Sequence, residues 1–149
     1  KSSLFTLVIL LTTLCISAQS AKDTLAIKEA TLNYIEGYFY KDGERMEKAL
    51  HPELVKRSIQ KSNDGHEFVV NRGASFMIMA AANNSNRYAA NPEEPIESVV
   101  EIYDIVGNAA TVKVSTNQYG FIDYLHIGKY YDEWKIINVF WASVTKEEK

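Results

Sequence analysis

The stretch 121-FIDYLHIGKYYDEWKIINVFW-141 decides the fold class of this chain. Two runs rich in β-branched and aromatic residues flank a Tyr-Asp-Glu segment, a pattern that predicts two strands joined by a tight turn. So short a connection forces the two strands to lie antiparallel. The same runs also contain ionisable and amide side chains, which are Asp123, His126, Lys129 and Asn138. These side chains either face water or line a pocket, and the rest of the sequence bears on this choice.

The sequence before this stretch predicts further strands and, before them, helices. Two more strands, at 96–106 and 109–119, are separated by Gly107 and Asn108. Farther upstream the pattern indicates helices at 23–40, 44–50 and 73–82 and two short strands at 54–60 and 67–70. In the first helix, Asp23 or Thr24 is the expected N-cap. Helices first and a four-stranded meander last is an α+β arrangement, in which the helices cover one face of a curved antiparallel sheet.

The N-terminal residues 1–20 have the pattern of a secretory signal peptide. Lys1 precedes an apolar run from Leu4 to Ile16, and small residues follow, so we expect cleavage near Ala18 or Ser20. The run is shorter than the roughly 20 apolar residues that a membrane-spanning helix needs, although an uncleaved anchor is the alternative. We therefore expect a secreted or periplasmic protein with no membrane attachment after cleavage. It would consist of one domain at 23–144 and a charged tail at 145–149.

Composition excludes several classes of chemistry. The only cysteine, Cys15, lies in the presumed signal, which leaves the mature chain without disulfides, thiolate nucleophiles or cysteine zinc sites. The three histidines show no metal-ligand spacing, so no metal site is expected, and no cofactor is expected either. With a formal net charge of −3 and no basic cluster, the chain is not expected to bind nucleic acid.

The turn after residue 130 determines which polar side chains share a face of the sheet. A two-residue turn pairs odd-numbered residues of one strand with even-numbered residues of the next, so Asp123 and Leu125 would share a face with Asn138 and Phe140. A three-residue loop would instead place His126 beside Asn138. Polar groups that interrupt an apolar face are what a ligand cavity requires. The alternative is that they only satisfy backbone groups at strand ends or bulges.

Several motifs resemble the putative lumazine-binding family of the nuclear transport factor 2-like superfamily, which also holds ketosteroid isomerase, scytalone dehydratase and polyketide cyclases. The resemblance covers roughly residues 24–142 and rests on 34-YIEG-37, 43-GERM-46, 51-HPELVKR-57, 123-DYLH-126 and 134-WKIINVFW-141. It implies a cone-shaped, curved antiparallel sheet with three helices closing a cavity. Function does not follow from it, because this fold hosts enzymes, binding proteins and dimerisation modules alike.

The candidate site combines this cavity with the polar positions. The expected ligand-binding residues are Tyr34, Tyr38, His51, Asp123, Leu125, Asn138 and Phe140. Asp123 is the candidate catalytic base, as an isomerase or dehydratase would need. A direct pair with His126 is not expected, because side chains three apart on a strand point to opposite faces.

Asp123 therefore needs a partner from elsewhere, and Tyr34, Tyr38 and His51 are the candidates. The tyrosines could instead be ordinary core residues, and His51 could cap a helix end. Lys56 and Arg57 are neighbours on a predicted strand, so we expect only one to point inward, where it could meet an anionic ligand. Of the two interpretations we favour a solvated surface pair.

Three hypotheses remain, and we favour binding over catalysis. The first is an exported domain that binds a small, partly apolar ligand of unknown identity without a cofactor. The second is an isomerase- or lyase-type enzyme with Asp123 as base. The third is an interaction module whose cavity is filled by side chains. The aromatic residues of the last strands also predict a homodimer through the sheet, because an uncovered apolar face needs a partner.

Overall fold

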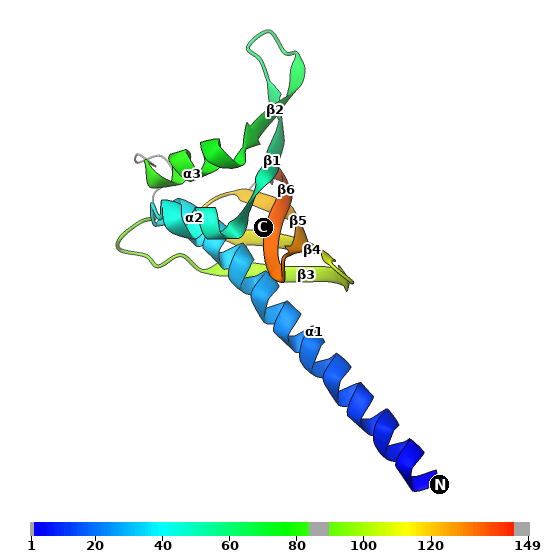
Figure 1. Ribbon diagram of the computed structural model, residues 1–149. Coiled ribbons are helices and arrows are strands. Elements are labelled where there is room, and N and C mark those ends of the chain that lie inside the picture. Colours follow the sequence, from blue (N-terminus) through cyan, green and yellow to red (C-terminus); the bar gives the residue numbers. More distant parts are fainter. Residues whose placement is uncertain (1, 84–89, 145–149) are drawn as a thin grey trace.

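The computed structural model describes residues 2–83 and 90–144, with side chains from residue 21 onward. This part of the chain forms an α+β fold, as predicted from the sequence (Figure 1). Its helices are α1 (Ser2–Phe39), α2 (Gly43–Ala49) and α3 (Ala74–Ala82). Its strands are β1 (Leu50–Lys61), β2 (Glu67–Gly73), β3 (Ser98–Val106), β4 (Ala109–Thr116), β5 (Phe121–Tyr130) and β6 (Glu133–Ser143).

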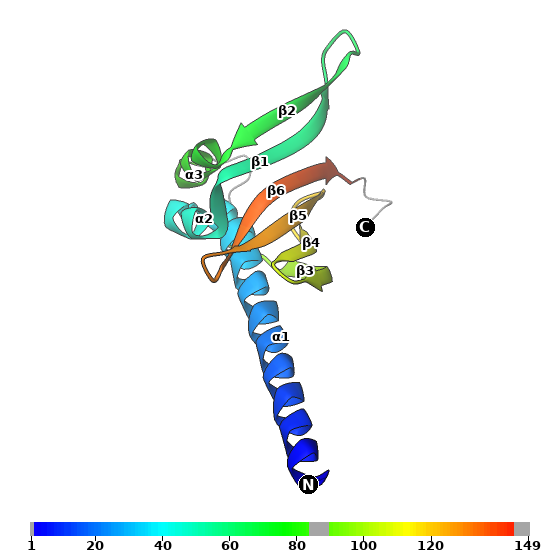
Figure 2. The same cartoon turned by 45° about the vertical axis from the view of Figure 1, so that its right-hand side comes forward.

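The six strands form one curved sheet in the order β2-β1-β6-β5-β4-β3 (Figure 2). The last four strands are the predicted antiparallel meander. The expectation of a wholly antiparallel sheet was wrong in one place, because β1 runs parallel to β6. Strand β1 starts directly after α2, and its first residue, Leu50, pairs with Ile136 near the start of β6. The two strands therefore start at the same end of the sheet and run in one direction.

Helix α1 packs against β6, β3 and β4, and α3 packs against β1 and β2 (Figures 1 and 2). The buried stripe of α1 includes Ile27, Tyr34 and Ile35, and because Tyr34 and Ile35 follow Ile27 by seven and eight positions, all three share one side of the helix. The main core also takes in Leu125 and Val139 from the sheet, both fully buried. The helices thus cover the concave side of the sheet.

Helix α1 begins well before the predicted N-cap, so Asp23 lies inside the helix and does not cap it. Its carboxylate accepts hydrogen bonds from Lys129 Nζ at 3.1 Å and from Trp134 Nε1 at 3.0 Å. These contacts fasten α1 to the β5–β6 end of the sheet. The cleavage of residues 1–20 stays a prediction, and the charged tail at 145–149 lies outside the described residues. No helix in the described part of the chain is long and apolar enough to span a membrane.

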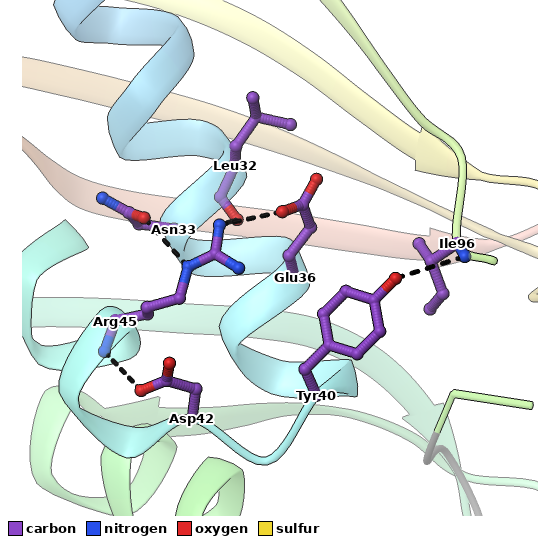
Figure 3. A network of polar contacts seen from close by, with 7 residues as sticks. All are labelled: Leu32, Asn33, Glu36, Tyr40, Asp42, Arg45 and Ile96. Carbon is purple, nitrogen blue, oxygen red and sulfur yellow. Dashed lines mark hydrogen bonds and ion pairs between the residues drawn. The ribbon is translucent and has the colours of Figure 1, made fainter. Parts of the chain in front are cut away.

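The α1–α2 corner is held by one arginine (Figure 3). Arg45 forms an ion pair with Glu36 at 2.8 Å and donates from Nε to Asn33 at 3.0 Å, while its backbone N–H donates to the N-cap residue Asp42 at 2.9 Å. Gly37 allows the helices to approach, because a Cβ there would lie 3.1 Å from backbone atoms of Asp42. The 34-YIEG-37 and 43-GERM-46 motifs therefore belong to a single helix junction.

The β5–β6 hairpin contains a bulge that changes which residues face inward. Its two-residue turn, Tyr131-Asp132, has positive φ angles of 47° and 63°, as in a type I′ turn. Ile127 pairs with Ile136, but His126 pairs with Asn138, so one extra residue, Ile137, is inserted in β6. From Asn138 onward, each side chain of β6 therefore lies on the opposite face from the one that a regular ladder would give it.

This bulge overturns the predicted face of two residues. Asn138 and Phe140 lie opposite His126 and Tyr124 on the outer face, whereas Trp141 lies opposite Asp123 on the inner face. The sequence argument placed Asn138 and Phe140 beside Asp123 because it assumed a regular ladder. The neighbours His126 and Asn138 do come together, through a bulge and not through the longer loop considered as the alternative.

Candidate functional site

A cavity of about 400 Å³ lies between α1, α3 and the inner face of the sheet. Most of its wall is apolar, and a few ionisable groups interrupt that wall. The lining residues are Tyr34, Ile35, Tyr38, Lys56, Gln60, Arg72, Phe76, Met77, Ala80, Phe121, Asp123 and Trp141. This volume and this composition are typical of small-molecule sites.

The polar centre of the cavity joins three elements. Asp123 of β5 is fully buried, and its Oδ2 accepts a short hydrogen bond from the Tyr34 hydroxyl of α1. Lys56 of β1 forms an ion pair with the same oxygen at 2.7 Å and donates to the Tyr34 hydroxyl at 2.5 Å. The buried carboxylate is therefore matched by a cation and by a neutral donor, the arrangement that a charge inside a protein requires.

The neighbours Lys56 and Arg57 point to opposite faces, as predicted. Lys56 points inward, with Nζ at 5.2 Å from the Tyr34 ring centroid and 5.6 Å from that of Trp141. Arg57 points outward and donates to Asn138 Oδ1, whose amide nitrogen lies 3.3 Å from His126 Nδ1. Asp123 and His126 accordingly form no pair, in agreement with the sequence argument.

Two buried polar atoms in the cavity wall lack a partner. Asp123 Oδ1 and Trp141 Nε1 are both buried, and neither forms a hydrogen bond within the described residues. They come from directly opposed positions of β5 and β6, and both residues border the cavity. Since buried polar groups are normally satisfied, this acceptor and this donor are available to a ligand.

Three of the predicted site residues line the cavity, namely Tyr34, Tyr38 and Asp123. Leu125 points inward along β5 but is fully buried in the core. Asn138 and Phe140 do not border this cavity, because the bulge turns them to the outer face.

His51 does not border the cavity either. Helix α2 ends at Ala49 with Leu50 as its C-cap, so His51 is a residue of β1 and not a helix cap. Its ring packs edge-on against Tyr130, with the two ring centroids 4.9 Å apart. The helix thus ends within one residue of its predicted end, and the strand begins there because the residue before Pro52 favours extended backbone.

Sequence reasoning missed part of the site. Trp141 is one of the aromatic residues from which the sequence predicts a dimer face, because the bulge that turns it inward has no clear local signal. Arg72 lies beyond the predicted end of its strand, and its inward direction follows only from the pairing of Lys56 with Arg72. Phe76 and Ala80 belong to a helix that was predicted as buried but was not linked to a site.

Within the residues that the structure describes, no three His, Cys, Asp or Glu side chains lie close enough together to hold a metal ion. The carboxylate of Asp123 accepts hydrogen bonds from Tyr34 and Lys56.

Burial raises the pKa of Tyr34 well above its ordinary value, and the nearby charge of Asp123 raises it further. An unfolded tyrosine ionises near pH 10, whereas folded Tyr34 keeps its proton there. Above about pH 10 the unfolded state releases a proton that the folded state retains, so stability falls as the pH rises. Below that pH this effect is absent.

Replacing Tyr34 by phenylalanine should remove this alkaline loss. Between about pH 10 and pH 11 we expect the free energy of unfolding to fall less steeply in Tyr34→Phe than in the original protein, by up to about 1.4 kcal/mol per pH unit. Urea unfolding at several pH values measures both slopes. Tyr103→Phe, at a residue that is 55% exposed, is the control and should keep the original slope. Equal slopes for Tyr34→Phe and the original protein would contradict the prediction.

Comparisons with known proteins agree with this architecture. A family model described as putative lumazine-binding matches residues 22–142. An NTF2-like protein of unknown function from Shewanella baltica is similar in structure, with a TM-score of 0.67, 19% identity, and coverage of 85% of this chain and 97% of that one. A similar protein from Silicibacter pomeroyi has a TM-score of 0.65 and 14% identity, with coverage of 83% and 98%.

A third similar structure shows the same fold. It is an NTF2-like protein with a cystatin-like fold from Novosphingobium aromaticivorans, with a TM-score of 0.64 and 11% identity over 93% of this chain and 94% of that one. At such identities these structures support the fold and not a shared activity. A comparison with curated proteins finds no match.

Proposed function

The chain belongs to the putative lumazine-binding family, and from this premise we propose that it binds one small, partly apolar molecule non-covalently in the cavity between α1, α3 and the sheet. The observation that carries the proposal is the pair of buried atoms without partners, Asp123 Oδ1 and Trp141 Nε1. A buried polar group left unsatisfied costs roughly 1–3 kcal/mol. A ligand that donates to the first atom and accepts from the second removes this cost.

The family name suggests lumazine as the first compound to test. Its bicyclic ring is flat, and it offers N–H donors beside carbonyl acceptors. This edge suits an acceptor and a donor that lie opposite each other on two strands, as Asp123 and Trp141 do. The flat ring suits a wall that contains Tyr38, Phe76 and Phe121.

Two measurements test the binding proposal. Lumazine is titrated into the protein while intrinsic fluorescence is followed, because Trp141 borders the site. In parallel, the protein is incubated with a metabolite mixture and desalted, and retained compounds are identified by mass spectrometry. A retained compound, lumazine or another, supports the proposal. If lumazine does not bind but another compound is retained, only lumazine is excluded as the ligand.

The control is a protein whose cavity is filled. Ala80 lines the cavity from α3, so Ala80→Trp should abolish retention. Its neighbour Met79 is 50% exposed, and Met79→Trp should leave retention unchanged. Retention that survives Ala80→Trp, or no retention of any compound, would exclude binding in this cavity.

An isomerase or dehydratase that uses Asp123 as base is the second candidate. It is favoured by Asp123 Oδ1, a carboxylate oxygen at the cavity wall without a partner among the described residues. Against it, Tyr34 and Lys56 both donate to the other oxygen, so the Tyr34 proton is not free to stabilise an oxyanion. A base of this kind would exchange carbon-bound hydrogen of the retained compound with D₂O, and Asp123→Asn would stop the exchange. Absence of exchange in the original protein would exclude the enzyme.

We also propose a homodimer through the outer face of the sheet. This face carries exposed apolar residues, among them Val99, Tyr103, Tyr124 and Phe140. Exposed apolar patches of this kind commonly mark protein interfaces. Sedimentation should show a dimer that Phe140→Lys converts to a monomer. Tyr131→Lys, in the turn away from this face, should leave the dimer intact. A monomer at high concentration would exclude the dimer.

Export of the protein is the last part of the proposal. It is supported by the apolar run Leu4–Ile16 followed by small residues. N-terminal sequencing of the exported protein should find a start just after Ala18 or Ser20, and recovery of an intact Lys1 would contradict cleavage.

A further inference from the structure

Arg72 brings a positive charge to the cavity that no acidic side chain of the described residues balances. It is half-buried on β2 and directly opposite Lys56 of β1, with both side chains on the inner face. Its guanidinium carbon lies 5.5 Å from the ring centroid of Phe76, a cation–π contact that holds the group at the cavity wall. Within the part of the chain that the structure describes, Arg72 forms no ion pair.

The other charges of the cavity neutralise each other. Among the described residues that line the cavity, Asp123 is the only acidic one, and its partner is Lys56 at 2.7 Å. The lining therefore carries one cation in excess, and that cation is Arg72. A planar guanidinium with free N–H groups is suited to pair with a carboxylate or sulfonate through two hydrogen bonds.

The spacing of the strands sets the size of the guest. Arg72 lies on β2 and Asp123 on β5, with β1 and β6 between them, so three strand spacings, or about 14 Å measured along the sheet, separate the two strands, and Asp123 is offset by two residues from the position in line with Arg72. The two side chains occupy part of this distance. The remaining span suits a molecule of two fused or linked rings.

The structure points to a chemical class of ligand. On the premise that the cavity binds a small molecule, we propose that its ligand is an aromatic organic anion whose acidic group pairs with Arg72 and whose N–H or O–H group donates to Asp123 Oδ1. The ring system lies among the aromatic side chains of the wall. Lys56 binds Oδ2 of Asp123, so Oδ1 is left to accept the hydrogen bond from the ligand.

Two fluorescent probes that differ in one acidic group separate this inference from the proposed function. Anilinonaphthalene sulfonate and phenylnaphthylamine share the same aromatic skeleton and the same N–H donor, but only the first carries a negative charge. Both should bind the original protein, the anion about tenfold more tightly, because a charge-assisted bidentate pair is added. Titrations followed by fluorescence measure the two affinities.

Variants locate the charge that makes the difference. Arg72→Gln should weaken binding of the anionic probe about tenfold and leave the affinity for the neutral probe unchanged. Arg57→Gln is the matched control, because Arg57 is an arginine of the same hairpin on the opposite face of the sheet, and it should change neither affinity. Arg72→Lys should keep part of the preference for the anion. Ala80→Trp should abolish binding of both probes.

Each other outcome overturns a different claim. If both probes bind equally, or if Arg72→Gln weakens them equally or not at all, the anion inference fails and the binding function stands. If neither probe binds, or if both still bind Ala80→Trp, the inference fails, and the metabolite retention experiment decides separately whether the cavity binds a molecule. Thermal unfolding of Arg72→Gln shows whether the variant is folded, and a folded Arg72→Gln with intact anion preference excludes Arg72 as the anion partner.

Discussion

Replacing Lys56 by methionine is expected to destabilise the folded protein by about 3–5 kcal/mol, the usual cost of removing one partner of a buried ion pair. Asp123 is fully buried, and in this variant it loses the one cation that pairs with it in the described part of the chain. Tyr34 alone would remain as a donor to the carboxylate. Urea unfolding at neutral pH, with the free energy extrapolated to water, measures the loss.

A second substitution shows that the loss comes from the unpaired charge. The double variant Lys56→Met with Asp123→Leu removes both charges, and we expect it to recover most of the lost stability, because apolar replacements of a buried pair are often neutral. Arg57→Met removes a cation from the outer face and should cost less than about 1 kcal/mol. A double variant as unstable as Lys56→Met would contradict the ion-pair explanation.

The bulge in β6 predicts opposite results for two adjacent residues. Val139 is fully buried, so Val139→Asn loses apolar burial and leaves an amide without partners, at a cost of about 3–5 kcal/mol. Asn138 lies on the outer face, where it contacts Arg57 and His126, so Asn138→Val should cost less than about 1 kcal/mol.

The same denaturation measurement checks this register. A regular ladder from the turn onward would bury Asn138 and expose Val139, and the two costs would be exchanged. Phe140→Asn is a control on the outer face and should behave like Asn138→Val, since Phe140 is 41% exposed. A large loss in Asn138→Val with a small one in Val139→Asn would show that the bulge does not form.

Local patterns predicted most of the fold. Alternation and short connections gave the β3–β6 meander, and helical spacing gave the buried stripe of α1 that holds Tyr34. The parallel pairing of β1 with β6 could not be predicted in this way, because it joins segments more than 80 residues apart and no connection length constrains it. Pairings of this kind depend on how all strands of the sheet assemble in three dimensions.

The candidate site was predicted only in part. Asp123 stood out as an acid among apolar residues, and Tyr34 and Tyr38 share one stripe of a helix, so periodicity was enough to find them. The inward direction of Trp141 depends on the position of the bulge, and that of Arg72 depends on the register of the β1–β2 hairpin. Neither feature can be read from the sequence. Side chains that depend on register are therefore the ones that a pattern misses.

Ile137 has a consequence for how proteins of this architecture diversify. It sets which face each later side chain of the strand occupies. If Ile137 paired with His126 in a regular ladder instead of lying in the bulge, Asn138 and Phe140 would replace Val139 and Trp141 at the inner wall while the main chain kept its course. Gly128 leaves room for the insertion, since a Cβ there would lie 2.5 Å from Ile137 Cδ1. A shift in strand pairing by one position can thus replace several wall residues at once without any mutation among them.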